Sequence, residues 1–145
     1  RNGFQTTPIM TTISSPQVEL GATVAELNAL VEQPASLAGL LPSDKVMEFQ
    51  STETGCSFKI AGGISIHLGL EKSSEGKPVR YSSLKGTPIR FHLDLIFSPL
   101  QGDGMRSIAE VVCEADLNPF TRMMAEKALT QLFETIAENL QATYP

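Results

Sequence analysis

The last quarter of the chain constrains the fold most strongly, because an Asn118-Pro119 step ends a run of alternating residues and begins a long amphipathic helix. Asparagine is a preferred helix N-cap and proline is favoured at the first helical position, so we expect Asn118→Ala to cost about 1 kcal/mol of stability. The helix is predicted over residues 119–141, where apolar side chains recur at three-and-four spacing. They are Phe120, Met124, Ala128, Leu129, Leu132, Phe133, Ile136 and Leu140. An apolar face of this length needs a partner surface.

Most of the chain before this helix alternates between apolar and polar residues with the period of a β-strand. A first strand is predicted over residues 12–20; Pro16 interrupts it and places it near a sheet edge or a bulge. The other predicted strands cover residues 46–51, 55–61, 64–71, 79–85, 89–97 and 105–117. Turns rich in Gly, Ser and Pro separate them at residues 62–63, 73–76, 86–88 and 99–104. The Gly102-Asp103-Gly104 segment is therefore interpreted as a turn.

Two short helices are predicted between the first and second strands. Thr23 followed three residues later by Glu26 forms a capping box, which starts a helix at Val24. This helix should end before Pro34, because the residue that precedes a proline disfavours the helical conformation. A second short helix is predicted over residues 35–41.

These elements together predict an α+β fold. Its centre is a curved seven-stranded antiparallel sheet around the long C-terminal helix, with the two short helices closing one end. Short turns favour pairing between neighbours, so strands two to seven should form a meander. One face of the sheet is apolar and the other is polar, which is typical of a sheet that is solvated on one side.

Composition narrows the possible functions. The chain has 145 residues, the size of one domain, and a formal net charge of -5 with no cluster of Lys and Arg. Nucleic-acid binding is disfavoured, since it needs a concentrated basic face. No stretch approaches the roughly 18 consecutive apolar residues of a membrane-spanning helix. The sequence predicts a cytoplasmic protein, and residues 1–9 are expected to be a flexible lead-in or a remnant of expression.

Two cysteines, Cys56 and Cys113, both lie in apolar strand patterns. We interpret them as buried thiols that act as small hydrophobic side chains. The alternative is a disulfide, which requires an oxidising compartment.

The order of elements resembles the helix-grip arrangement of the SRPBCC superfamily, which includes START-type lipid binders, pollen-allergen-like proteins and polyketide cyclases. The local sequence resembles a small, uncharacterised bacterial branch of that superfamily. In that branch a Cys-Ser-Phe strand, here residues 56–58, precedes a glycine turn, and the last strand runs into Ala-Asp-Leu-Asn-Pro-Phe, here residues 115–120. The resemblance implies one helix-grip domain over residues 10–145, with a cavity between the long helix and the concave sheet. It implies no shared catalytic residues.

The predicted ligand-binding residues are the apolar side chains expected to face that cavity. They are Phe58, Ile60, Leu68, Leu70, Tyr81, Phe91, Leu93, Leu95, Val111, Met123, Met124, Leu129, Phe133 and Ile136. The alternative is that these side chains fill the space as a solid core. Tyr81 has the one hydroxyl in this set, which either orients a ligand or bonds to the backbone, as buried tyrosines commonly do. We favour the backbone bond.

The only histidines, His67 and His92, are assigned to the solvated face together with Asp94, because they alternate with the apolar residues. No metal site, cofactor or catalytic motif is predicted. The favoured function is non-catalytic binding or transport of a hydrophobic or amphipathic small molecule, such as a lipid. The alternatives are a cyclase or hydratase that uses the same cavity, and a protein-interaction module that uses the acidic outer face. The residues of that face are Glu71, Asp94, Glu110, Glu114 and Asp116.

Overall fold

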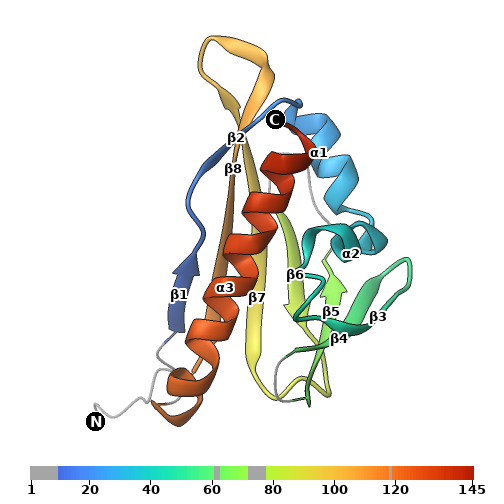
Figure 1. Cartoon of the computed structure of the whole chain (residues 1–145), viewed down its shortest axis with the longest axis vertical. Coiled ribbons are helices and arrows are strands. Elements are labelled where there is room, and N and C mark those ends of the chain that lie inside the picture. Colours follow the sequence, from blue (N-terminus) through green and yellow to red (C-terminus); the bar gives the residue numbers. More distant parts are fainter. Residues whose placement is uncertain (1–9, 61–62, 72–77, 118) are drawn as a thin grey trace, which may run out of the picture.

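The computed structural model shows one curved antiparallel sheet with a long helix lying along it (Figure 1). It describes residues 10–60, 63–71, 78–117 and 119–145, without the side chains of Met10, Phe120, Thr121 and Met124. The strands are β1 (Met10–Ser14), β2 (Val18–Leu20), β3 (Met47–Ser51), β4 (Gly55–Ile60), β5 (Ile64–Leu70), β6 (Val79–Ser83), β7 (Arg90–Leu100) and β8 (Asp103–Asp116). Their order in the sheet is β1-β8-β7-β6-β5-β4-β3, with β2 also on β8. The predicted meander, helix-grip arrangement and α+β class are therefore confirmed.

The sheet has eight strands where the sequence predicted seven, because the predicted strand over residues 12–20 is two strands. Pro16 lies in the break and has no N–H to donate to a ladder. Ser15 maintains the pairing there. Its backbone N–H donates to the carbonyl of Val111 at 2.8 Å, and its hydroxyl accepts the N–H of Val111 at 2.9 Å. A side chain thus replaces a backbone acceptor, and β2 resumes the pairing with β8.

The hairpin of β7 and β8 is longer than predicted, and the expected loop over residues 99–104 is wrong. Both strands continue into it, leaving only Gln101 and Gly102 between them. Gly102 has a φ of 87°, which glycine adopts without a steric penalty. The turn interpretation is right only for this glycine, because Asp103 and Gly104 belong to β8. The hairpin projects beyond the rest of the molecule (Figure 1).

The short helices follow their predicted signals closely. α1 (Val24–Val31) begins with the predicted capping box: the N–H of Glu26 donates to the hydroxyl of Thr23 at 3.2 Å, and the carboxylate of Glu26 accepts the N–H of Thr23 at 3.4 Å. The predicted helix over residues 35–41 is a 3-10 turn, η1 (Pro34–Ser36), followed by one α-helical turn, α2 (Leu37–Leu40).

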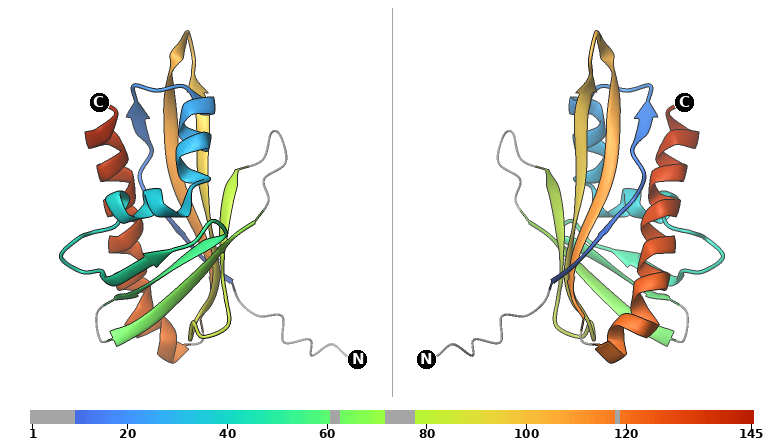
Figure 2. Two further views of the ribbon diagram at one scale, coloured as in Figure 1. Left: turned by 90° about the vertical axis from the view of Figure 1, so that its right-hand side faces the viewer. Right: turned by 90° about the vertical axis from the view of Figure 1, so that its left-hand side faces the viewer.

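The C-terminal helix α3 (Pro119–Thr143) packs against β8, β1, β2 and α2. Its buried face includes Leu129, Leu132, Phe133, Ile136 and Leu140, which confirms these members of the predicted apolar pattern. The side views in Figure 2 show α3 and α2 on the same side of the sheet. The predicted cap Asn118 and the turns at residues 62 and 73–76 lie outside the described residues. Within the described part of the chain, no helix is long and apolar enough to cross a membrane.

Candidate functional site

The concave face of the sheet carries most of the predicted ligand-binding residues, and they are buried together in one apolar cluster. Alternation along β4, β5, β6 and β7 places every second side chain on this face. The buried members of the predicted set are Phe58, Ile60, Leu68, Tyr81, Phe91, Leu93, Leu95, Val111, Leu129, Phe133 and Ile136. Leu70 is partly buried and packs against the cluster. Contact of these side chains with a ligand stays a prediction.

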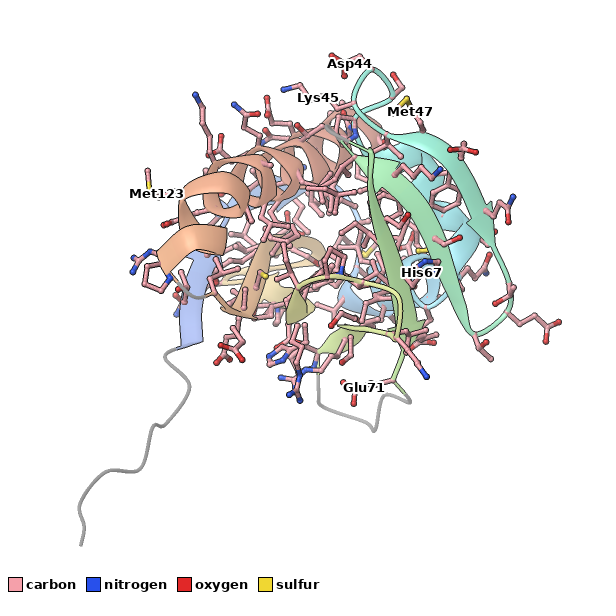
Figure 3. The ribbon with its side chains drawn as sticks, turned by 90° about the horizontal axis from the view of Figure 1, so that it is seen from below. Asp44, Lys45, Met47, His67, Glu71 and Met123 are labelled. Atoms are coloured by element: carbon pink, nitrogen blue, oxygen red, sulfur yellow. The ribbon has the colours of Figure 1, made fainter. Side chains whose placement is uncertain are left out.

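Met123 does not belong to this set. Its side chain is 88% exposed, and Figure 3 shows it pointing away from the body of the protein. The reason is helical phase: Met123 lies two residues before the buried Ala125, or about 200° around the helix, and so faces solvent. The neighbouring prediction, Met124, concerns a side chain outside the description.

Tyr81 is fully buried, and its hydroxyl donates a hydrogen bond to the carbonyl of Val31. This bond joins β6 to the last residue of α1, which confirms the backbone partner favoured from the sequence. Burial raises the pKa of Tyr81 well above its ordinary value. The hydroxyl thus stays protonated at neutral pH and stabilises the junction between sheet and helix.

Few polar side chains are buried in the described part of the chain: Thr11, Ser15 and Ser107. The hydroxyl of Ser107 donates to the carbonyl of Ala22 at 2.7 Å, and that of Ser15 is used at the break between β1 and β2. All three lie on β8 or on the N-terminal segment paired with it. The buried side of β4 to β7 therefore offers hydrophobic contact and desolvation as its main chemistry.

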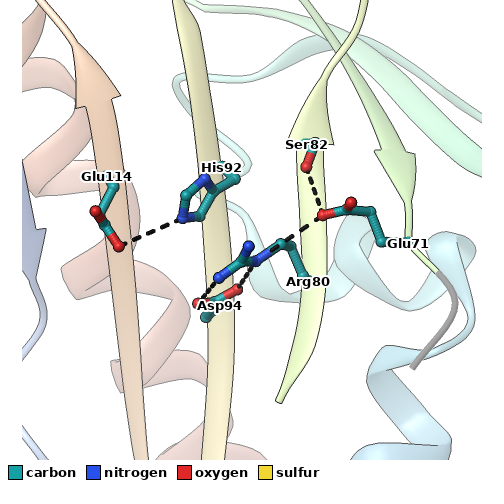
Figure 4. Close-up of polar contacts among 6 residues, drawn as sticks. All are labelled: Glu71, Arg80, Ser82, His92, Asp94 and Glu114. Atoms are coloured by element: carbon teal, nitrogen blue, oxygen red, sulfur yellow. Dashed lines mark hydrogen bonds and ion pairs between the residues drawn. The ribbon is translucent and has the colours of Figure 1, made fainter. Parts of the chain in front are cut away.

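The outer face of β6, β7 and β8 carries polar side chains that bind one another across the strands (Figure 4). Arg80 donates two hydrogen bonds to the carboxylate of Asp94, at 2.7 and 2.9 Å, and the hydroxyl of Ser82 donates to Glu71 at 2.8 Å. The bond to Asp94 raises the pKa of Arg80 further. His92 Nε2 lies 3.5 Å from Glu114. The predicted outward position of His92 and Asp94 is confirmed.

His67 also lies opposite the buried residues of β5 and is half-buried. No group of three or more potential metal ligands occurs among the described residues. Cys56 and Cys113 are buried free thiols, which confirms the interpretation favoured from the sequence. Burial raises the pKa of each thiol to about 12.

Two surface hollows were missed by the sequence analysis, because loops and neighbouring strands form them together. One, of about 560 Å³, lies between α2, α3 and the connecting residues 41–45. Two hydrogen bonds hold this region to α3: Asn139 Nδ2 donates to the carbonyl of Leu40 in α2 at 2.8 Å, and Lys45 Nζ in the loop donates to Gln131 at 3.2 Å. The other, of about 260 Å³, lies at β3, β4 and β5. Hollows of this kind leave no periodic signal in a sequence.

No protein-family model matches this sequence, and no curated protein matches it either. Many solved structures share the fold. A norcoclaurine synthase structure from Thalictrum flavum aligns with a TM-score of 0.73 at 11% identity, over 96% of each chain. A START superfamily protein from Mycobacterium smegmatis aligns with a TM-score of 0.68 at 12% identity, over 93% of this chain and 96% of the other.

A third structure, the XoxI protein from Bacillus cereus, aligns with a TM-score of 0.68 at 16% identity, over 93% of this chain and 94% of the other. At these identities the likenesses show the class of protein at the level of fold alone: the chain has the helix-grip fold that these structures share. They combine a START protein with an enzyme, so the shared fold accommodates both kinds of protein.

Proposed function

We propose that the protein binds a hydrophobic or amphipathic small molecule between α3 and the concave face of the sheet. The observation that carries this proposal is the chemistry of the buried surface of β4 to β7. Every buried side chain there is apolar, apart from the hydroxyl of Tyr81, which is already bonded to Val31. Such a surface stabilises an apolar ligand by about 25 cal/mol for each Å² that it removes from water.

The placement of α3 supports this location. The helix packs chiefly against β8, β1, β2 and α2, at one side of the curved sheet. Phe58 and Leu68 belong to β4 and β5, which lie far from β8 in the order of the sheet, and Leu93 belongs to β7 near its centre. An apolar ligand bound here would replace contacts between apolar side chains with contacts to itself. The backbone hydrogen bonds of the sheet would stay intact.

The second candidate function is an enzyme of the cyclase or hydratase kind that uses the same space. It is favoured by the likeness to norcoclaurine synthase, one structure of which is a complex with dopamine and hydroxybenzaldehyde. Proton transfer would need an acid or base inside the site. No Asp, Glu, His, Lys or Arg among the described residues is buried. We therefore place binding before catalysis.

The remaining candidate, a protein-interaction module, relies on the acidic outer face. Asp94 and Glu71 on that face are already paired with Arg80, and Glu114 lies beside His92. These pairings reduce the net field that a basic partner would meet, which places this function third. We also propose a reducing, cytoplasmic location, since both cysteines are free thiols.

A matched pair of substitutions tests the proposal. Leu68 and Leu20 are both buried leucines, but Leu68 belongs to the predicted ligand-binding set and Leu20 lies in β2 outside it. Overpacking a filled core costs about 1–3 kcal/mol. If a ligand space lies beside Leu68, Leu68→Phe keeps the melting temperature and lowers the affinity for the apolar dye 1-anilinonaphthalene-8-sulfonate. Leu20→Phe should instead lower the melting temperature and leave the dye affinity of the folded protein unchanged.

Native mass spectrometry of the purified protein supplies the second readout. We expect a bound apolar molecule to be retained by the wild-type chain and lost from Leu68→Phe. Equal destabilisation by the two substitutions, together with an empty wild-type protein that binds no dye, would show a solid core and overturn the proposal.

A further inference from the structure

The outer face of β3, β4 and β5 carries a row of three polar side chains. Ser57 of β4 is paired in register with Gln50 of β3 on one side and with His67 of β5 on the other. Directly paired residues on one face of a sheet have Cβ atoms about 4.5–5.5 Å apart. A single small molecule can therefore reach all three side chains at once.

These three side chains bind nothing else in the described part of the chain. The side chains of Gln50 and Ser57 and the imidazole of His67 form no hydrogen bond with another described residue. The outer face of β6 to β8 differs, because Arg80, Asp94, Ser82 and Glu71 bind one another there. The row on β3 to β5 thus has unused donors and acceptors directed away from the core.

The same three residues line the hollow of about 260 Å³. Gly55 and Gly69, paired across β4 and β5, contribute no side chains beside it. The wall on one side is Leu84, which is 51% exposed and lies over Gly69, with its Cδ2 only 3.0 Å from where a Cβ on Gly69 would be. Thr52 and Thr54 also line the hollow, and their hydroxyl oxygens lie 3.4 Å from each other.

The imidazole of His67 is held in place by the turn after β6. A Cβ on Gly86 would lie 3.1 Å from His67 Cδ2, so the bare backbone at residue 86 allows the ring to pack there. Thr87 fixes the strand beneath the ring, since its hydroxyl accepts the N–H of His67 at 2.7 Å and donates to the His67 carbonyl at 3.1 Å. The wall and the polar row are therefore positioned before any ligand arrives.

The chemistry of this hollow selects its ligand. No Asp, Glu, Lys or Arg lines it, so a charged ligand would meet no opposite charge. The amide of Gln50, the hydroxyls and the imidazole of His67 are all polar groups that hydrogen-bond, and the amide and hydroxyls each both donate and accept. Their complement is a group that also does both, which is the hydroxyl, while Leu84 offers an apolar surface for C–H groups. The volume lies just below the roughly 300 Å³ at which ligand pockets usually begin, so it suits one small ring.

We propose that this outer-face hollow is a second binding site, for an uncharged small molecule that is rich in hydroxyl groups, the simplest example being one sugar ring. The polar row lies on the opposite face of the sheet from the apolar site, and Leu68 is the residue of the predicted apolar set that also borders this hollow. With few contacts to a small ligand, we expect a dissociation constant on the order of 1–10 mM.

The two histidines provide the experiment. His67 borders the hollow, whereas His92 lies in the paired network on β7, so the Cε1–H resonances of the two imidazoles carry different expectations. In a ¹H–¹³C NMR titration with D-glucose, D-galactose and N-acetyl-D-glucosamine, at least one sugar should shift the His67 resonance to saturation and leave that of His92 unchanged. Glucose 6-phosphate should bind more weakly than glucose.

Two variants make the test specific. His67→Phe keeps a ring against Gly86 and removes both nitrogens, and we expect at least a tenfold loss of sugar affinity; the matched control His92→Phe should lose none. Gly69→Ala places a Cβ 3.0 Å from Leu84 Cδ2, which displaces this wall of the hollow and should also weaken binding, while retention of the His92 resonance shows that the sheet is folded. The proposal is overturned if no sugar saturates the His67 resonance, if both resonances move together, or if glucose 6-phosphate binds as tightly as glucose.

Discussion

The two ends of the meander differ in almost every structural respect. β7 and β8 have 11 and 14 residues and pair without a register shift as far as Pro99, and β8 also binds β1 and β2. β3, β4 and β5 have only 5, 6 and 7 residues. The register of β3 shifts between Met47 and Gln50, where Glu48 takes a φ of 55°, which is unfavourable for a residue with a Cβ.

This difference indicates that the two ends of the meander have different roles, one in stabilising the fold and the other in binding. At the β7–β8 end, α3 and α1 pack against the strands, and Arg80 of β6 is paired with Asp94 of β7 on the outer face. At the β3–β5 end, the outer polar row has no internal partners and the hollow lies beside it. We therefore regard the β7–β8 end as the scaffold, assign the outer-face site to β3, β4 and β5, and propose that the apolar ligand lies nearer to β4, β5 and β6, with β7 shared between the two roles.

The largest expected effect is the loss of a core leucine from the scaffold. Leu95 of β7 is fully buried between Val79 and Val111, its register partners, so Leu95→Ala should leave a cavity and cost about 4–5 kcal/mol of unfolding free energy. Leu68→Ala in β5 should cost only about 2–3 kcal/mol, because space already adjoins that side chain in our proposal. Urea denaturation of both variants measures the difference. Equal losses of unfolding free energy in the two variants would contradict the division of the sheet into a scaffold end and a binding end.

The two thiols report on the same division. Burial raises both pKa values from 9.0 to about 12, so the thiolate fraction at pH 8 falls about 1,000-fold below that of an ordinary thiol. Ellman's reagent should therefore react very slowly with the native protein. After denaturation it should react readily with both thiols. Cys56, which lines the outer hollow, should react before Cys113 in β8.

Single-cysteine variants, Cys113→Ala and Cys56→Ala, assign the two rates. A raised pKa in the folded state stabilises the protein fully below the pKa of the unfolded thiol, and this contribution is lost as pH rises toward the folded value. Stability should thus fall between about pH 9 and 12. Faster reaction of Cys113 than of Cys56 would contradict the assignment of β8 to the more rigid end.

The break between β1 and β2 provides an intermediate effect. Ser15→Ala removes the acceptor of the buried Val111 N–H, which should cost about 1–3 kcal/mol. Ser14→Ala, one residue earlier and exposed, should change stability by less than about 0.5 kcal/mol. Thermal unfolding of the pair measures both. A negligible loss from Ser15→Ala would show that the scaffold does not depend on this hydroxyl.

The smallest effect is expected on the outer side of α3, which belongs to neither end of the sheet. Met123→Ala removes a side chain that is 88% exposed, so stability should stay within about 0.5 kcal/mol and dye binding should not change. Leu129→Ala, on the buried side of the same helix, should cost about 2–5 kcal/mol. A clear loss of dye affinity in Met123→Ala would show that this residue contributes to ligand binding after all.

Much of the fold could be predicted because its signals are local. Alternation with period two separated the buried Phe58, Leu68 and Leu93 from the outward His67 and His92, since successive side chains of a strand point to opposite faces. The capping box and the prolines marked the helix starts for the same reason: the groups that satisfy a helix end lie within a few residues of it. The prediction for Met123 failed because it did not follow the helical phase: Glu126 and Lys127, three and four residues later on the same side of α3, mark that side as polar.

By itself, therefore, the sequence determined the order of the elements, the face to which each strand residue points and the apolar character of the interior. Only the tertiary structure shows that β2 pairs with β8 again after the interruption at Pro16, that Tyr81 bonds to Val31 and that Gln50, Ser57 and His67 form one row. Each of these depends on the register between segments far apart in the chain. Register is set by the packing of the whole sheet, which no local period records.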